Sequence, residues 1–155
     1  MYQATDYQEN RSQLRARLIG VIVPAVALLV LFFVAFILRW PEAVASASLC
    51  LMCAVLIFGV SMLIAPVNAY GKHIEHALNG RTRKLQGTFQ SMEDKAVGRD
   101  GVMFYPFVVN VGNPEEPEDD RLFYMDANLP RPDWKTGEML EITSYDNRVT
   151  AWERV

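Results

Sequence analysis

The chain has 155 residues, of which 51% are hydrophobic, and its 15 basic and 18 acidic side chains leave a formal charge of −3. A nucleic-acid-binding protein normally carries a basic stripe or patch, so nucleic acid is not expected as a partner. Both cysteines, Cys50 and Cys53, lie within an apolar stretch, which excludes a disulfide framework for the rest of the chain.

The chain begins with a polar segment followed by a long apolar run. Residues 1–17 are predicted to form an N-terminal tail, frayed over its first ten residues. Residues 18–38 then contain no charged, amide or hydroxyl side chain. Because a hydrocarbon core about 30 Å thick needs roughly 20 helical residues, this run is long enough to cross a membrane.

A second apolar stretch, Ala43–Val67, follows after only four residues. Residues 18–67 are therefore predicted to form a hairpin of two transmembrane helices. A buried hairpin in a soluble protein would need a much larger chain to cover two helices that are apolar all round. Residues 43–45 resemble a signal-peptide cleavage site, but the first run exceeds the usual signal core of about 7–15 residues.

The basic residues predict the orientation of this hairpin. Seven lie on the terminal sides of the two runs, whereas Arg39 alone lies in the connection. The seven are Arg11, Arg15, Arg17, Lys72, Arg81, Arg83 and Lys84. The positive-inside bias then puts both termini in the cytoplasm of a multi-pass protein of the plasma membrane.

The second span is rich in small residues, which let helix backbones approach closely in lipid. The predicted helix-packing positions are Ser46, Cys50, Ala54, Gly59 and Ser61. One interpretation is packing against the first span of the same chain. The other is contact with a second copy or another membrane protein.

Residues 68–83 are predicted to form a juxtamembrane helix that ends at Asn79-Gly80, followed by a basic linker. Here His73 and His76, together with Cys50 and Cys53, imitate a zinc-binding pattern. An unbroken helix would separate Cys53 from His73 by ~30 Å, far beyond the reach of one ion. We therefore expect no metal site, and interpret His73, Glu75 and His76 as a solvated helix face or, alternatively, an incomplete site at an oligomer axis.

Residues 84–155 have the pattern of a small all-β domain. Five strands are predicted, at Leu85–Met92, Val102–Val111, Leu122–Ala127, Met139–Tyr145 and Arg148–Val155. Asp146-Asn147 is predicted to be a two-residue hairpin turn, and Pro106 to mark an edge or a bulge. Five short strands in about 70 residues favour an OB- or SH3-like five-stranded barrel.

Few residues of this domain indicate catalysis. It contains no Cys and no His, which excludes Cys–His and Ser–His pairs. Its carboxylates have no spacing that implies a paired acid and base, and no cofactor is expected. The carboxylates considered are Asp126, Asp133, Glu138, Glu141 and Asp146.

The candidate partner-binding residues belong to two features of this domain. The first is an acidic loop, whose carboxylates are Glu115, Glu116, Glu118, Asp119 and Asp120. We interpret this loop either as a solvated hairpin loop or as a docking site for a basic partner or a divalent cation. The second is Trp134, which is predicted to be exposed between Pro132 and Gly137 and to anchor a partner.

The order of two spans and a C-terminal β domain, closed by Gly137–Ile142 and Asn147–Ala151, resembles the NfeD-like membrane proteins. The segment Phe104–Val108, followed later by Gly137–Ile142, is similar to segments of other small, uncharacterised bacterial membrane proteins. In those proteins the β segment often lies between the spans, whereas here it follows both. The NfeD-like resemblance implies an OB fold and, as for some members, association with stomatin-like scaffold proteins. It supplies no catalytic residue.

The sequence therefore predicts an integral membrane protein in which a cytosolic β-barrel serves as a non-enzymatic interaction module. Its partners would be the bilayer and either a protein or a second copy of the chain. One alternative is an accessory subunit of a membrane transport, protease or scaffold complex, acting through its transmembrane helices. Another is a membrane-bound enzyme, which requires several of the carboxylates to line one cleft.

Overall fold

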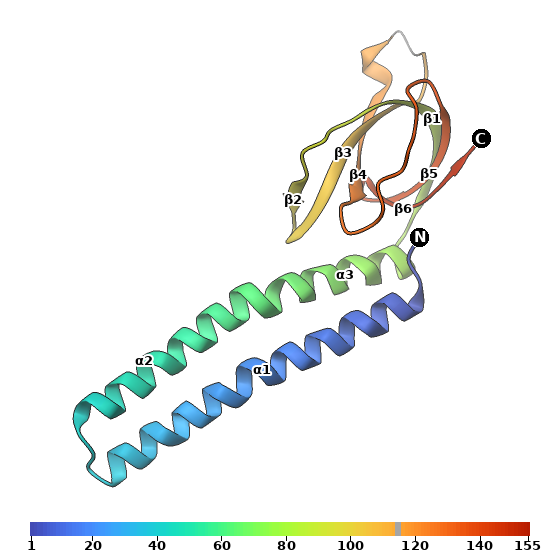
Figure 1. The fold of residues 1–155 in the computed structure, drawn as a ribbon. Coiled ribbons are helices and arrows are strands. Elements are labelled where there is room, and N and C mark those ends of the chain that lie inside the picture. Colours follow the sequence, from blue (N-terminus) through green and yellow to red (C-terminus); the bar gives the residue numbers. More distant parts are fainter. Residues whose placement is uncertain (114–115) are drawn as a thin grey trace. The chain divides into compact units, whose positions relative to one another are not determined.

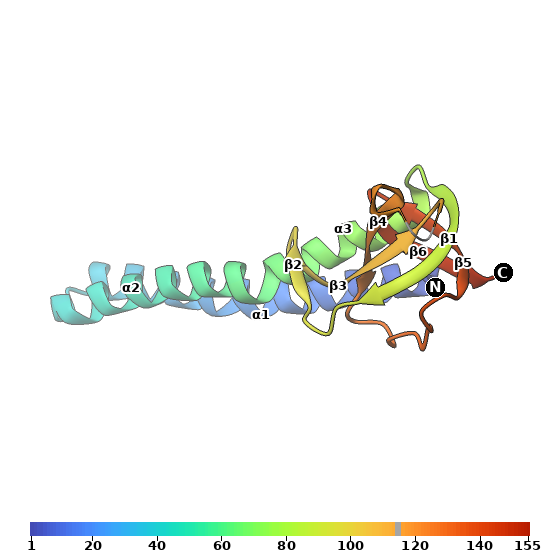
Figure 2. The ribbon, with the colours of Figure 1, turned by 90° about the horizontal axis from the view of Figure 1, so that it is seen from above.

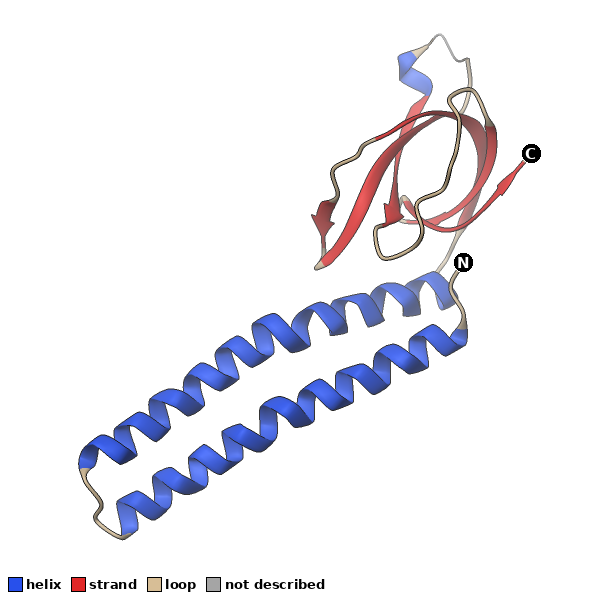
Figure 3. Cartoon of the chain, in the orientation of Figure 1, coloured by secondary structure: helices blue, strands red, loops and turns tan. Residues whose placement is uncertain are grey.

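The computed structural model describes residues 1–113 and 116–155. The chain divides into two compact units. One consists of residues 8–68, and the other combines residues 1–7 with residues 69–155. The first is helical and the second contains the sheet (Figure 1, Figure 3). We call them the hairpin and the β unit.

Two long helical segments account for the hairpin. The first is α1, Ala4–Ile37, and the second is a continuous run of three elements. These are α2 (Glu42–Phe58), the π-helix η1 (Gly59–Ile64) and α3 (Ala65–Asn79). Both segments are long and apolar enough to cross a membrane, and only 17% and 11% of their most apolar stretches are buried. The helices α1 and α2 lie side by side (Figure 1, Figure 2).

The segment predicted as a frayed tail is helical from Ala4 onward. The backbone N–H of Gln3 donates to the Asp6 carboxylate at 2.8 Å, which satisfies a donor at the start of the helix. This contact is half of a capping box. The sequence pattern missed this helix because its residues are polar all round rather than amphipathic.

Pro66 explains the unusual backbone of the second segment. It has no N–H to donate, so it leaves a carbonyl of the preceding turn without its helical partner. The π-helical turn lies immediately before it, with the Ala65 N–H bonded to the carbonyl of Val60. In addition, Nη1 of Arg17 donates to the Leu63 carbonyl at 3.1 Å. Such adjustments are how apolar helices accommodate proline.

Close packing holds the two helices of the hairpin together. A Cβ built at Gly59 would lie 2.7 Å from both methyl groups of Val21, so a larger residue there would force the two helices or the Val21 side chain to shift. Ser48 is also buried, and its hydroxyl donates to the Ala45 carbonyl at 2.9 Å. Asn10 is buried too and donates to the Val67 carbonyl at 3.2 Å. The few buried polar groups of the hairpin are thus paired.

The β unit contains a six-stranded mixed sheet that nearly closes into a ring (Figure 1). The strands are β1 (Arg83–Met92), β2 (Val97–Arg99), β3 (Val102–Asn110), β4 (Asp120–Asp126), β5 (Met139–Tyr145) and β6 (Arg148–Arg154). Their order is β1-β5-β6-β4-β3-β2, with a further pairing of β1 and β3. The pairing of β4 with β6 is a single parallel bridge, Tyr124 with Arg148.

Strand β1 bends and pairs with two other strands, β5 and β3. Its first half pairs with β5 and its second half with β3, across an irregularity between Phe89 and Ser91. A Cβ at Gly87 would lie 2.5 Å from the Asn110 carbonyl oxygen, which explains the glycine at this bend. The bend is what brings the sheet round toward closure.

All five predicted strands are present near their predicted limits, and the turn at Asp146-Asn147 is confirmed by positive φ angles of 48° and 60°. The expected number of five strands is wrong, since β2 is a sixth. With three residues, it is too short to show an alternating pattern. Pro106 lies where the partner of β3 changes from β2 to β1, so its missing N–H interrupts neither ladder.

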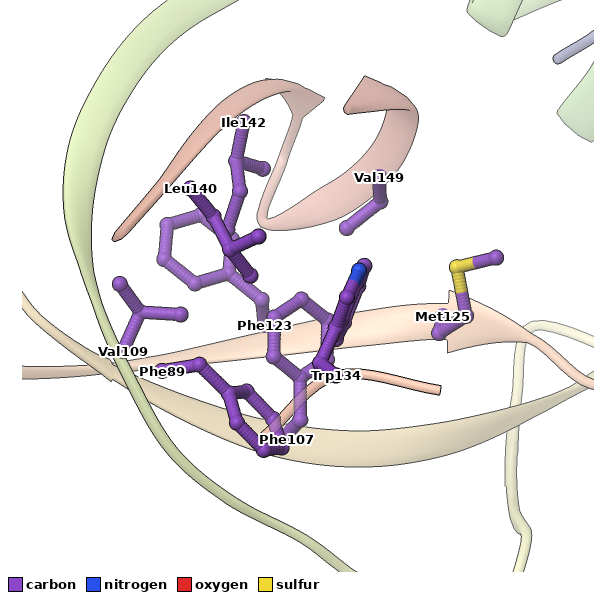
Figure 4. Close-up of a cluster of buried hydrophobic side chains, with 9 residues drawn as sticks. All are labelled: Phe89, Phe107, Val109, Phe123, Met125, Trp134, Leu140, Ile142 and Val149. Carbon is purple, nitrogen blue, oxygen red and sulfur yellow. The ribbon is translucent and has the colours of Figure 1, made fainter. Parts of the chain in front are cut away.

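The core of the β unit lies inside the curved sheet (Figure 4). It consists of Phe89, Phe107, Val109, Phe123, Met125, Trp134, Leu140, Ile142 and Val149. The prediction that Trp134 is exposed is wrong: only 8% of it is accessible. Its ring lies 5.0 Å from that of Phe107 and 5.1 Å from that of Trp152. The loop folds back and inserts the indole into the sheet, because burying so large a ring is strongly favourable.

The C-terminal part of α3, residues 69–79, packs against the sheet. The His73 ring meets Phe104 edge-on at 5.2 Å, and the His76 ring stacks on Tyr145 at 5.1 Å. Gly101, at φ 79°, is also close to this helix, since a Cβ there would lie 2.9 Å from that of Ala69. These contacts hold the C-terminal end of α3, with His73, against the sheet.

Candidate functional site

A buried chain of hydrogen bonds links three distant parts of the β unit. The hydroxyl of Tyr2 lies 2.9 Å from Nε2 of His73 and donates to Oδ2 of Asp126 at 2.9 Å. Asp126 is fully buried at the end of β4, where its Oδ1 also accepts from the backbone and side chain of Asn128. The residues come from the N-terminal segment, α3 and the sheet, so the cluster ties these elements together.

The direction of the hydrogen bonds follows from the charge states. Burial is the main reason that the pKa of His73 is lowered to about 4; the Asp126 carboxylate opposes this shift, and the nearby Arg148 and His76 contribute to it. Burial and the nearby Asp126 carboxylate raise the pKa of Tyr2 and of Tyr70 above the ordinary range. At neutral pH, His73 is therefore neutral and donates from Nε2 to Tyr2, which in turn donates to the Asp126 carboxylate.

Arg148 extends the cluster on the sheet side. Its guanidinium is nearly buried, with 9% of the side chain accessible, and it pairs with the Asp100 carboxylate. It also lies over the Phe104 ring, 5.5 Å from the centroid. Three buried side-chain nitrogens have no hydrogen-bond partner among the described residues. Nε of Arg148 and Nδ1 of His73 belong to this cluster, and the third is Nε1 of Trp134 in the core. The cluster is thus tightly enclosed within the β unit.

A second feature of the β unit is an open surface hollow of about 660 Å³. It is lined by residues 81–83, which run from the connector after α3 into the first residue of β1, and by residues 144–147 around the β5–β6 turn. Two arginines, Arg81 and Arg83, belong to the lining. The hollow combines positive charge, hydroxyl groups and one aromatic ring, which suits a polar anion.

The acidic loop is partly organised by its own hydrogen bonds. Nδ2 of the buried Asn110 donates to Oδ1 of Asp120 at 2.9 Å and to the Glu116 carbonyl at 3.1 Å. The Asp119 carboxylate accepts from the backbone N–H of Asn113 at 3.0 Å. Residues 117–119 form a 3₁₀ turn. The predicted residue Glu115 lies outside the described residues, whereas the Glu116 and Glu118 residues are exposed.

The small residues of the second span divide into two groups. Gly59 is buried against α1, but Ser46, Cys50 and Ser61 are exposed and Ala54 is half-buried. Ser48, which was not predicted, is buried instead. Contact between the two helices therefore uses Gly59 and Ser48, and most of the predicted stripe faces away from the hairpin interior.

The interpretation of residues 73–76 as a solvated face or an oligomer-axis site is wrong for His73, which is 2% exposed. Glu75 and His76 do lie on the surface. Within residues 1–113 and 116–155, no three His, Cys, Asp or Glu side chains are grouped so that they could hold a metal ion.

The carboxylates considered for catalysis are dispersed. Asp133 and Glu138 both pair with Arg154, and Lys84 donates to Glu141 at 2.8 Å, lowering the pKa of that carboxyl. Asp126 is enclosed, and Asp146 is the one member of the set that lines the hollow. They do not share a cleft in the described part of the chain.

Sequence reasoning missed the buried cluster because its members are far apart. Tyr2 is 71 residues from His73 and 124 residues from Asp126. One local signal was available: His73 directly precedes Ile74, which shares an apolar helix face with Val67 and Leu78 at helical spacing. No family model matches this chain, and neither curated proteins nor solved structures give a match.

Proposed function

We propose that the chain is an integral membrane protein that anchors a small cytosolic β domain, and that it acts by binding a partner rather than by catalysis. The observation that carries this proposal is the exposure of the apolar side chains along α1 and α2. Phe36 and Ile37 in α1 are exposed, as are Ile57 and Phe58 in α2. Exposed apolar surface on this scale is stable only in contact with lipid or with another apolar surface.

Two observations support the proposed topology: one concerns the side of the membrane, and the other puts both termini on the same side. The basic residues flank the terminal sides of the hairpin. Independently, Tyr2 is hydrogen-bonded to His73 and Asp126 within the β unit. A chain whose first residues belong to the same compact unit as its C-terminal domain must keep both on one side of the membrane, which requires an even number of spans.

We further propose that the β unit is a barrel of the OB type, related to that of the NfeD-like proteins. Apart from the short β2, the strands join in the ring order β1-β3-β4-β6-β5, with one weak seam between β4 and β6. A five-stranded, partly open Greek-key barrel is the description of the OB fold. The sharply bent β1, shared by two partners, supports this assignment over an SH3-like barrel.

The proposed partner surface is the tip of the acidic loop. Glu116 and Glu118 are exposed there, on a turn that Asn110 holds in place. A preorganised acidic surface favours a basic partner, mainly by accelerating association. Replacing both glutamates by glutamine should weaken capture of that partner in a salt-dependent manner. The matched variant Glu93→Gln with Asp94→Asn, at an exposed acidic pair elsewhere, should not.

Topology is the decisive test of the anchoring proposal. In a background with Cys50→Ser and Cys53→Ser, the variant Glu118→Cys should react with a membrane-impermeant thiol reagent only in inverted vesicles. The matched variant Trp40→Cys, in the connection between the helices, should react only from the opposite side. Labelling of Glu118→Cys in intact cells, or release of the protein from membranes at alkaline pH, would overturn the proposal.

A second candidate function is that of an accessory subunit that binds its complex through α2. The exposure of Ser46, Cys50 and Ser61 favours it, because small residues permit close approach of another helix. Ser46→Leu should then abolish co-purification of the complex while the β domain stays folded. Leu49→Phe, at a neighbouring exposed position, is the control for added bulk.

A further inference from the structure

The hollow beside the end of α3 is a defined part of the β unit rather than a loose surface depression. One wall consists of residues 81–83 and the other of residues 144–147. The two walls are joined by strand pairing, since Arg83 lies opposite Ser144 in the β1–β5 ladder. The turn is fixed by the positive φ angles of Asp146 and Asn147, and the Tyr145 ring is stacked on His76.

The two arginines of the hollow differ from the other arginines of the β unit in having no interaction partner among the described residues. Arg81 and Arg83 are exposed and make no ion pair or side-chain hydrogen bond with the described residues. The other five each have a partner. Arg99 lies over the Tyr124 ring, Arg121 donates to backbone carbonyls, and Arg131, Arg148 and Arg154 pair with carboxylates.

The lining contains one acidic residue, Asp146, against its two arginines, so one positive charge remains. The Asp146 carboxylate also lies 4.0 Å from the Arg148 guanidinium, which pairs with Asp100 as well. Neither Thr82 nor Ser144 uses its hydroxyl in a hydrogen bond to the described residues. Two unpaired guanidinium groups and two available hydroxyls therefore line one concave surface.

We infer that this hollow binds a phosphate ester whose organic part is small and carries hydroxyl groups. Guanidinium groups bind phosphate oxygens in two-pronged, charge-assisted hydrogen bonds. The hydroxyls and the amide of Asn147 suit the polar body of such a ligand, and Tyr145 offers an aromatic ring beside them. The volume of about 660 Å³ is within the range of small-molecule sites and exceeds what an inorganic ion needs.

The same chemistry can come from a soluble metabolite or from the headgroup of an anionic lipid. The inference goes beyond the proposed anchoring role, because the hollow lies in the β unit and needs no partner protein. Two arms of one experiment on the full chain distinguish the sources. In detergent, titration with glycerol 1-phosphate tests the soluble source. In nanodiscs of phosphatidylcholine and phosphatidylglycerol, native mass spectrometry of the lipids retained tests the lipid source.

The test variant is Arg81→Gln with Arg83→Gln, and its control is Lys95→Gln with Lys135→Gln, which removes two exposed positive charges elsewhere. We expect the arginine variant to lose about ten-fold or more in affinity for one of the two ligands, and the control to change it little. Circular dichroism checks that both variants are folded. The milder Arg81→Lys with Arg83→Lys should bind weakly, because an ammonium group lacks the two-pronged geometry.

Binding of glycerol 1-phosphate that only the arginine variant loses supports the inference with a soluble ligand. Selective retention of phosphatidylglycerol that only the arginine variant loses supports it with a lipid. If neither ligand binds, or if the control weakens binding as much as the arginine variant, the inference is wrong and the hollow is ordinary basic surface.

Discussion

Apolar side chains face inward in the β unit and outward in the hairpin. Phe107 and Leu140 in the sheet are 1% and 0% exposed, whereas Ile37 in α1 and Met62 in η1 are 72% and 69% exposed. The β unit thus covers its own core, as a domain in water must. The hairpin leaves its largest side chains for its surroundings to cover. This contrast is the one expected if lipid surrounds the hairpin, as we propose.

The buried polar groups also differ between the hairpin and the β unit. The hairpin buries few of them, and Asn10 and Ser48 both donate to backbone carbonyls of their own unit. The β unit buries a charged and ionisable cluster around Asp126 and Arg148. A buried carboxylate is tolerated there because the Tyr2 hydroxyl and the amide groups of Asn128 compensate for its lost water.

The largest expected effect comes from opening a cavity in the core of the β unit. Phe107→Ala should lower its free energy of unfolding by about 3–5 kcal/mol, since the ring is buried against Phe123 and Trp134. Denaturant unfolding followed by tryptophan fluorescence measures this, in a Trp40→Phe background so that the signal comes only from the β unit.

The matched change in the hairpin is Phe36→Ala, which removes the same side chain from an exposed position. It should leave the unfolding of the β unit unchanged. Equal destabilisation by both variants would contradict the contrast between the two units.

Acidification should destabilise the β unit through His73. Because the folded pKa of about 4 lies below the ordinary 6.5, the unfolded chain binds more protons between these values. The stability conferred by neutral His73 is therefore complete above about pH 6.5 and is lost as the pH falls toward 4, by roughly 3 kcal/mol. Unfolding free energies measured across this range give the slope.

His73→Gln should flatten this slope even if it lowers stability at neutral pH, because the titrating group is gone. His76→Gln, at an exposed position on the same helix, should leave the slope as it is. A slope that His73→Gln does not reduce would assign the acid sensitivity to the carboxylates instead.

The Tyr2 hydroxyl connects the N-terminal segment to α3 and the sheet through its hydrogen bonds to His73 and Asp126. Tyr2→Phe removes the hydroxyl that joins His73 to Asp126 and leaves both polar groups buried without it. The cost should be about 1–3 kcal/mol, with faster hydrogen exchange in residues 1–7. Tyr105→Phe, at a half-buried tyrosine of β3, is the control and should change neither quantity.

The elements that could be predicted are those specified by local pattern. Twenty-one apolar residues in succession predict the apolar part of α1, and the hydrophobic pattern with good turn residues predicts five of the strands. The hairpin turn at Asp146-Asn147 was predictable because few residues other than glycine adopt positive φ so readily. Each of these signals lies within about 20 residues of sequence.

What escaped prediction depends on contacts between distant segments. Trp134 stands in a polar, proline-rich loop, and only the fold shows that this loop returns to the core. The link from Tyr2 to Asp126 spans most of the chain, so no window of sequence contains it. The short strand β2 forms by pairing with the edge of β3. Its three residues are too few to show a strand pattern in the sequence.

The smallest net effect is expected in the hairpin, because the higher helix propensity of alanine, worth up to about 1 kcal/mol, offsets part of the overpacking cost of Gly59→Ala. Gly59→Ala brings a Cβ within 2.7 Å of the Val21 methyl groups, so the helices must separate slightly, at a cost of about 1–3 kcal/mol. Gly20→Ala is the matched control, because nothing lies within 4 Å of its new methyl group. It should be neutral or stabilising, since alanine favours a helix by up to about 1 kcal/mol over glycine. Hydrogen exchange of residues 42–64 in nanodiscs measures both, and equal protection in the two variants would show that contact between the helices contributes little to the stability of the hairpin.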